Sequence, residues 1–206
     1  MIPSQRSQRV ALYGGTFDPI HCGHLAVARA AVDTFRLTKV LFTPCARSPF
    51  KDKAPKARDD QRLEMLERAT EGLAWAEVNR NELDNPPPSY TWKTLEQVRA
   101  NLPDEAALFL LIGQDQWRMF HHWREYERIL QMAELIVLGR PGEPLDSPPL
   151  EGIDPARIHL LPGDHPASAS VLREAFAKGE LSPELTEWLP EGVRTFLEQE
   201  NPYEEA

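Results

Sequence analysis

Residues 108–112 read LFLLI, and this unbroken apolar run constrains the fold more than any other feature of the chain. A strand with one face in water alternates polar and apolar residues, whereas a strand covered on both faces is apolar throughout. Further runs rich in apolar residues, at 10–13, 39–43, 74–78, 135–138 and 157–161, indicate more strands. They are separated by stretches with apolar residues at helical spacing. This alternation predicts an α/β fold: a doubly wound, Rossmann-like parallel sheet with helices on both faces.

The organisation of the chain indicates a single domain covering residues 1–206. Its core is expected at about 8–165, followed by a small helical C-terminal part at 168–200 that is broken at Gly179, Pro183 and Pro190. The sequence contains no internal repeat, low-complexity tract or linker long enough to separate domains. Ligands of a doubly wound sheet bind at the carboxyl ends of its strands, so the loops that follow the strands form the candidate site.

The charge and the cysteine content of the chain indicate which binding partners and which cellular compartment to expect. Lys and Arg total 23 against 32 Asp and Glu, and the formal charge of −9 disfavours nucleic acids and anionic membrane surfaces. Only two cysteines occur, and no apolar run approaches the roughly 20 residues that span a bilayer. We expect a cytoplasmic protein with no nucleic-acid or membrane partner. The sequence leaves open whether the protein forms a homo-oligomer. A small phosphate compound is compatible, because a local site can be positive on an acidic protein.

The segment after the first expected strand, residues 14–24, reads GGTFDPIHCGH. Gly14 and Gly15 allow backbone N–H groups to approach a ligand closely. A helix is expected to begin near His21, and the N-terminus of a helix favours an anion. His21 and His24 lie on or near one face of its first turn, where both imidazoles can donate hydrogen bonds to phosphate oxygens. The segment therefore predicts a phosphate site.

Two other interpretations of the histidines remain. A His-x-x-His pair can bind a metal ion, although Asp18 is the only further ligand of the right type nearby in sequence and the glycines would then have no role. The segment can also be a tight strand–helix turn with incidental histidines. A dinucleotide motif of the G-x-G-x-x-G type is absent. We favour the phosphate site and expect no metal ion bound by protein side chains.

The same segment resembles the GGTFDPxHxGH signature of bacterial nicotinate-nucleotide adenylyltransferases, a branch of the HxGH nucleotidylyltransferase superfamily. Further landmarks resemble this family in the same order, through nearly the whole chain. They are Pro44 with Pro49, Phe50 and Lys51; Pro88 to Thr91; Gly113 to Asp115 followed by Trp123; Arg140 with Pro141; and Ser168 to Arg173. Two positions depart from the pattern. Phe50 stands where a histidine is common, and Ala169 removes one hydroxyl from the family's Ser-Ser-Thr box.

The resemblance implies transfer of the adenylyl group of ATP to nicotinate mononucleotide, which gives nicotinate adenine dinucleotide and pyrophosphate in NAD biosynthesis. It also implies Mg²⁺, bound mainly through the ATP phosphates. The attacking phosphate monoester has a second pKa of about 6, so it needs no general base at neutral pH. The alternatives are another acceptor, such as nicotinamide mononucleotide or phosphopantetheine, and a module that binds nucleotides without turnover.

The family motifs imply roles for individual residues of this chain. His21 and His24 are implied as the catalytic pair. The implied ATP-binding residues are Gly14, Gly15, Thr16, Phe17, Gly113, Asp115, Arg140, Ser168, Ser170 and Arg173. The implied nicotinate-nucleotide-binding residues are Asp18, Lys51, Tyr90, Thr91, Trp92 and Trp123.

The chemistry of single residues leaves several of these roles open. Asp115 follows the most apolar strand, where its carboxylate can accept hydrogen bonds from ribose hydroxyls or cap the next helix. Residues 90–92 are expected to begin a helix whose N–H groups can receive the nicotinate carboxylate. Trp123 can stack on the pyridine ring or belong to the apolar stripe of a helix. Arg173 can bind phosphate or face solvent.

Overall fold

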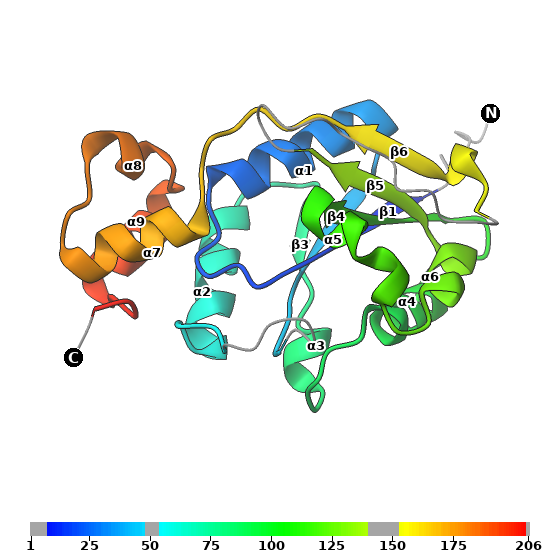
Figure 1. Cartoon of the computed structure of the whole chain (residues 1–206), viewed down its shortest axis with the longest axis horizontal. Helices are drawn as coiled ribbons and strands as arrows, with labels where there is room; N and C mark the ends of the chain where they lie inside the picture. The colour runs from blue at the N-terminus through cyan, green and yellow to red at the C-terminus, as the bar shows by residue number, and fades with distance from the viewer. Residues whose placement is uncertain (1–7, 48–53, 140–152, 205–206) are drawn as a thin grey trace.

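The computed structural model describes residues 8–47, 54–139 and 153–204. Its strands are β1 (Arg9–Gly15), β2 (Lys39–Pro44), β3 (Ala76–Val78), β4 (Ala107–Gly113), β5 (Glu134–Leu138) and β6 (Ile158–Leu161). They form a six-stranded sheet in the order β3-β2-β1-β4-β5-β6, and every neighbouring pair is parallel (Figure 1). The chain winds from β1 outwards to β3, crosses to β4 and winds outwards to β6. The predicted doubly wound parallel sheet is therefore confirmed.

Helices lie between the strands and follow the last one. They are α1 (Cys22–Phe35), α2 (Asp59–Thr70), α3 (Asn81–Asp84), α4 (Thr91–Ala100), α5 (Gln114–Arg118), α6 (Tyr126–Met132), α7 (Ala169–Lys178), α8 (Pro183–Glu187) and α9 (Glu191–Gln199), with 3-10 turns η1 (Phe120–His122) and η2 (Pro155–Arg157). Within the described ranges, none combines the length and apolar character that crossing a membrane requires.

Two apolar layers explain why the central strands are apolar throughout. On one face of the sheet, Phe109 and Leu111 of β4 belong to an apolar cluster that also contains residues of α1, α2, α7 and α9. On the other face, α4, α5 and α6 pack against Leu108, Leu110 and Ile112 of the same strand. All five residues are at most 4% exposed. Because both faces of β4 are covered, polar residues have no place in the run.

The direction of winding reverses between β1 and β4, which are hydrogen-bonded neighbours. At such a switch point, the loops that leave the two strands diverge and a crevice opens between them. Gly14 and Gly15 end β1, and Gly113 ends β4. The fold therefore brings the loop after Gly15 and the segment after Gly113 to one edge of the sheet.

The helical C-terminal part has the breaks that the sequence predicts. Gly179 ends α7 with a left-handed φ of 68°, Pro183 begins α8, and Pro190 is the N-cap of α9. Leu172 of α7 and Val193 of α9 are fully buried in the same apolar cluster as α1 and α2. These helices consequently extend one apolar layer of the domain beyond the edge of the sheet (Figure 1).

The segment between β4 and β5 differs from the sequence-based expectation. A single helix was expected to carry Trp123 and Tyr126 on one face, but α6 begins only at Tyr126. Glu125 precedes it with a left-handed φ of 58°, so the chain turns there and Trp123 lies in the connection from η1. The five-residue helix α5 has no apolar period in the sequence, and it begins at Gln114, so Asp115 lies in its first turn and not at its cap. Helices this short show no apolar period, because their stability comes from tertiary packing.

Candidate active site

Two adjoining cavities lie at the switch point of the sheet. The larger has a volume of about 1260 Å³ and the smaller about 330 Å³. The residues that line both are Gly14, Gly15, Thr16, Cys45, Gly113 and Gln116. The ends of β1 and β4 therefore form the boundary at which molecules bound in the two cavities would meet.

The two histidines of the motif begin α1 and line the larger cavity. His21 is the N-cap residue, and its backbone N–H donates a 3.2 Å hydrogen bond to Nδ1 of His24. The two rings stack with their centroids 3.7 Å apart. Because Nδ1 of His24 accepts a hydrogen bond, a neutral ring carries its proton on Nε2. His24 can thus act as a hydrogen-bond donor through Nε2 without being charged.

His21 is also held in its neutral form. Its side chain is 7% exposed, and burial lowers its pKa to about 4, with a smaller contribution from the nearby positive charge of His165. At neutral pH the imidazole therefore carries one proton and no charge. Both histidines can donate one hydrogen bond each to an anion beside α1.

Two arginine side chains donate hydrogen bonds to backbone carbonyl groups of the loop between β1 and α1. Arg62 of α2 is fully buried and donates a 2.7 Å hydrogen bond to the carbonyl oxygen of Thr16. Arg173 of α7 donates a 2.7 Å bond to the carbonyl oxygen of Asp18. Because these bonds come from two different helices, the path of the loop is fixed by the tertiary structure as well as by its own sequence.

Asp18 occupies a structural position within this loop. Its carboxylate accepts hydrogen bonds from the N–H of Lys56 (2.8 Å), the N–H of Ala57 (3.1 Å) and the hydroxyl of Tyr203 (3.0 Å). The residue is 4% exposed and borders the larger cavity. This geometry does not support the expected contact with the nicotinate nucleotide, because donors within the protein already engage both carboxylate oxygens.

The start of α7 faces the same larger cavity as the histidines. Ser168, Ser170 and Arg173 all line it. Arg173 donates a 3.1 Å hydrogen bond to Oγ of Ser170, which orients both groups. Ser168 is the N-cap residue of α7, although its hydroxyl makes no capping bond. The structure thus brings the second predicted phosphate-binding segment to the cavity of the first.

Gly113 and Asp115 reach the cavities from the other strand of the switch point. Gly113 is the N-cap residue of α5, and Asp115 lies in the first turn, where it pairs with Arg118 at 3.8 Å. Asp115 borders the larger cavity, and it is not the cap of the helix. Two further predicted residues, Arg140 and Lys51, lie outside the described residues.

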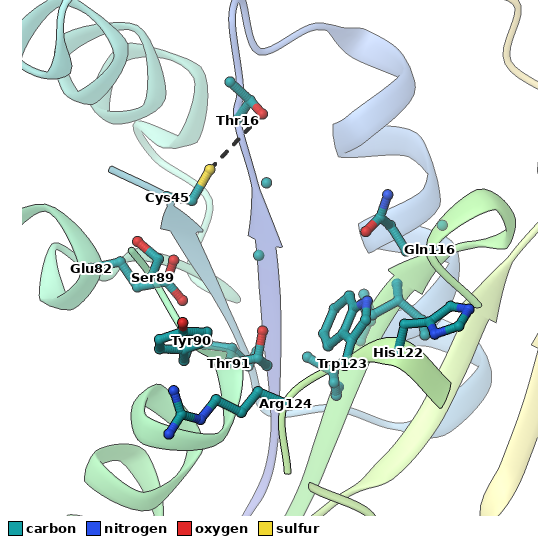
Figure 2. A pocket seen from close by; sticks show the side chains of 17 residues that line it. Thr16, Cys45, Glu82, Ser89, Tyr90, Thr91, Gln116, His122, Trp123 and Arg124 are labelled. Carbon is teal, nitrogen blue, oxygen red and sulfur yellow. Dashed lines mark hydrogen bonds between the residues drawn. The ribbon is translucent and has the colours of Figure 1, made fainter. Parts of the chain in front are cut away.

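The smaller cavity has the form of a slot between two aromatic side chains. Tyr90 and Trp123 approach it from opposite sides, with Thr91 between them (Figure 2). Tyr90 is the N-cap residue of α4, so the first N–H groups of that helix lie beside the slot. Trp92 does not line it. Its ring packs in the apolar layer under α4, with the guanidinium of Arg128 4.9 Å from the ring centroid.

Several residues at the two cavities were missed by sequence reasoning. They are Cys45, Glu82, Ser89, Gln116, His122 and Arg124 at the smaller cavity, and His165 at the larger. Glu82 is 7% exposed, accepts a 2.9 Å hydrogen bond from Oγ1 of Thr94, and also bonds Ser89. Burial raises the pKa of Glu82. Ser89 stands in the landmark from Pro88 to Thr91, although no role was inferred for it. The others stand in no motif with recognisable spacing, and the fold brings them to the site.

Comparison with known proteins gives the same assignment at the level of the family. Residues 12–188 match the cytidylyltransferase-like family model. A probable nicotinate-nucleotide adenylyltransferase of Thermus thermophilus is 35% identical over 195 residues, 95% of this chain and 99% of the relative. Another, from Methylacidiphilum infernorum, is 40% identical over 140 residues, 68% of each chain.

Solved structures agree on the fold. The nicotinic acid mononucleotide adenylyltransferase of Plasmodium falciparum, in complex with NaAD, superposes with a TM-score of 0.73 at 16% identity, covering 95% of this chain and 97% of the other. A putative nicotinate-nucleotide adenylyltransferase from Vibrio parahaemolyticus gives a TM-score of 0.67 at 17% identity, covering 97% of each. The family model and the Thermus thermophilus relative place the chain in the cytidylyltransferase-like family, among the nicotinate-nucleotide adenylyltransferases.

Proposed function

We propose that this protein transfers the adenylyl group of ATP to nicotinate mononucleotide, as a step of NAD biosynthesis in the cytoplasm. An oxygen of the mononucleotide phosphate attacks the α-phosphorus of ATP and forms a new P–O bond. The bond from the α-phosphorus to the bridging oxygen breaks, and its electron pair leaves with pyrophosphate. The observation that carries this proposal is the pair of cavities that adjoin at Gly14, Gly15 and Thr16, with His21 and His24 at the start of α1 lining the larger one.

ATP is assigned to the larger cavity, whose volume and lining suit a nucleotide. The carboxylate of Asp115 would accept from the ribose hydroxyls, and the N–H groups of residues 14–17 would face the phosphates. Ser168, Ser170 and Arg173 would bind the phosphate chain with charge-assisted hydrogen bonds. Arg140 is kept as an adenine-side contact on the strength of the family motif alone.

His21 and His24 are assigned to the α-phosphate. The attacking phosphate is already ionised, so the reaction needs positioning and stabilisation of negative charge, not a general base. Each histidine would donate its N–H to an oxygen on which charge develops in the transition state. Because both donors are fixed before the substrate binds, little reorganisation accompanies the reaction.

The side chains at the larger cavity fit a magnesium–ATP complex whose metal ion is carried by the nucleotide. Imidazole, guanidinium and hydroxyl groups face the expected phosphates, and these groups suit phosphate oxygens better than a hard cation. Mg²⁺ would neutralise part of the phosphate charge when bound. Phosphate oxygens and water would hold it, and Asp115 is one of the carboxylates that line the cavity.

Nicotinate mononucleotide is assigned to the smaller cavity. Tyr90 and Trp123 offer flat faces on either side of a pyridine ring, and the N-terminus of α4 can receive its carboxylate. A helix N-terminus favours an anion by about 0.3–2 kcal/mol, depending on burial. This range corresponds to a preference of about two- to thirtyfold for the acid over the amide. Lys51 stays a family-based assignment.

Pyrophosphate release tests the proposal directly. The protein would be incubated with ATP and Mg²⁺, in parallel with nicotinate mononucleotide, nicotinamide mononucleotide and phosphopantetheine. Rapid release with the nicotinate compound and slower release with the others would support both the reaction and the carboxylate assignment. Equal rates with the two pyridine nucleotides would overturn the carboxylate assignment. Absence of release with the nicotinate compound at high enzyme concentration would overturn the proposed reaction.

A further inference from the structure

A third imidazole faces the larger cavity, and no motif accounts for it. His165 lies in the connection between β6 and α7 and lines the cavity together with His21 and His24. The residue is half-buried. It stands in a local GDHPA sequence whose residue types predict only a loop. The fold therefore brings this imidazole to the cavity, although the local sequence gives no sign of it.

The backbone fixes the protonation pattern of this ring. The N–H of Ala167 donates a 3.1 Å hydrogen bond to Nδ1 of His165. With Nδ1 as acceptor, the neutral ring carries its proton on Nε2, at the opposite side of the imidazole. His24 has the same arrangement, since its Nδ1 accepts from the N–H of His21. His165 and His24 thus each use Nδ1 as an acceptor for a backbone N–H, which makes Nε2 the donor of the ring.

Close packing holds the connection that carries His165. A Cβ atom on Gly163 would lie 2.4 Å from the carbonyl oxygen of Gly139, so only glycine allows this approach to the end of β5. Ala167 packs against the start of α1, where its Cβ lies 3.4 Å from the position that a Cβ on Gly23 would take. The loop is therefore supported on both sides of His165, next to the helix start that carries the motif histidines.

His165 is near enough to His21 for their charges to interact. Its positive charge is the second cause, after burial, of the lowered pKa of His21. An anion between or beside the two imidazoles would offset this unfavourable effect on His21. A polyphosphate supplies such an anion, and Ser168 and Arg173 of the same cavity would share its charge.

We infer that His165 is a third phosphate-binding histidine, which donates Nε2–H to the β- or γ-phosphate of ATP and hence to the leaving pyrophosphate. This inference rests on the proposed adenylyl transfer. The α-phosphate must react at the junction of the two cavities, beside residues 14–16, and the motif histidines follow directly on that loop. His165 lines the larger cavity beside the start of α7, with the groups assigned to the phosphate chain. As the bridging P–O bond breaks, its donor would stabilise the charge that moves onto pyrophosphate.

Two substitutions separate a binding role from a structural one. In H165N, the amide oxygen can accept the N–H of Ala167 in place of Nδ1, but the distal donor is lost. In H165Q, the longer amide places an N–H₂ group near the position of Nε2. H121N serves as the matched control, because His121 is exposed and lines neither cavity. Thermal unfolding of every variant shows whether the fold is retained.

The readouts are titration calorimetry with inorganic pyrophosphate and the KM for ATP in the transfer assay. We expect H165N to weaken pyrophosphate binding and raise KM by about tenfold or more, as for loss of a hydrogen bond to a charged group. H165Q should retain most of the affinity, and H121N should match the parent protein. Unchanged pyrophosphate affinity in H165N would overturn the inference, as would equal losses in H165N and H165Q with lowered thermal stability. A third outcome would overturn the proposed function alone. In it, the parent protein binds pyrophosphate more tightly than H165N does but transfers no adenylyl group to nicotinate mononucleotide.

Discussion

The hydroxyl of Tyr203 donates a 3.0 Å hydrogen bond to Oδ1 of Asp18, across a separation of 185 residues. Tyr203 is 1% exposed, and its ring packs near Phe176 of α7. Burial, together with the charge of Asp18, raises the pKa of Tyr203, so its hydroxyl stays protonated and can donate. The segment that follows α9 therefore helps to set the conformation of the loop between β1 and α1, which carries the predicted phosphate-facing backbone.

Substitution of Tyr203 by Phe should lower both stability and activity. The variant keeps the buried ring but removes one of three hydrogen bonds to a buried carboxylate, which should cost about 1.5–3 kcal/mol in the free energy of unfolding. Urea denaturation measures this loss. The control is Y126F, since Tyr126 donates only an exposed 3.4 Å bond to Glu127 and its removal should change stability by less than about 0.5 kcal/mol. Equal effects of the two substitutions would contradict the structural role of the Asp18–Tyr203 bond.

The sequence predicts the sheet and the phosphate loop because both depend on local patterns. The unbroken apolar run identifies β4, and the spacing of glycines and histidines identifies residues 14–24 as the phosphate loop. The Asp18–Tyr203 bond has no local signal, because its partners are far apart in the chain and each is an ordinary residue type. Hence the sequence-based role of Asp18 as a substrate contact did not anticipate its internal partners. Glu82 was missed for a related reason: its helix, α3, has only four residues and no readable period.

Substitution of His24 by Asn should reduce kcat far more than it weakens ATP binding. The amide oxygen of Asn can accept the N–H of His21 as Nδ1 does, so the start of α1 is retained while the Nε2–H donor is lost. Removal of a donor to a developing negative charge costs about 100-fold or more in kcat. Steady-state kinetics and ATP titration, with H24A as a comparison that loses both functions, measure the two effects. A raised KM with an unchanged kcat would show that His24 binds the ground state and the transition state equally, which would contradict the prediction.

Acid should destabilise the protein partly through His21. In the unfolded chain a histidine binds a proton near pH 6.5, whereas His21 in the folded protein does so only near pH 4. Between these values the unfolded chain binds more protons, so the free energy of unfolding falls as pH decreases from about 6.5 to 4, by up to about 3 kcal/mol. Denaturation of the parent protein and H21N at pH 7.5 and 4.5 tests this, and Asn is a favourable N-cap residue for α1. The fall should be smaller in H21N; an identical fall in both proteins would contradict the prediction.

Glu82 should control the affinity for nicotinate mononucleotide without contacting the phosphates of ATP. Its carboxylate bonds Thr94 and Ser89, and Oγ of Ser89 accepts a 3.2 Å hydrogen bond from the N–H of Ala46. Glu82 thereby connects the start of α4 to the loop after β2, and both segments contribute residues to the lining of the smaller cavity. Without these bonds, the start of α4 in E82A should be held less firmly, and with it the position of Tyr90 opposite Trp123. The KM for the mononucleotide should then rise by about tenfold.

The KM for ATP should change little in E82A, because Glu82 does not line the larger cavity. E82Q keeps one acceptor oxygen and should retain most of the affinity. E77A is the matched control, since Glu77 lies on β3 and pairs with Lys39 away from both cavities. A proportional rise in both KM values would mean that Glu82 supports the fold in general, whereas a rise confined to the mononucleotide would show that the acceptor at Glu82 positions α4 for this substrate.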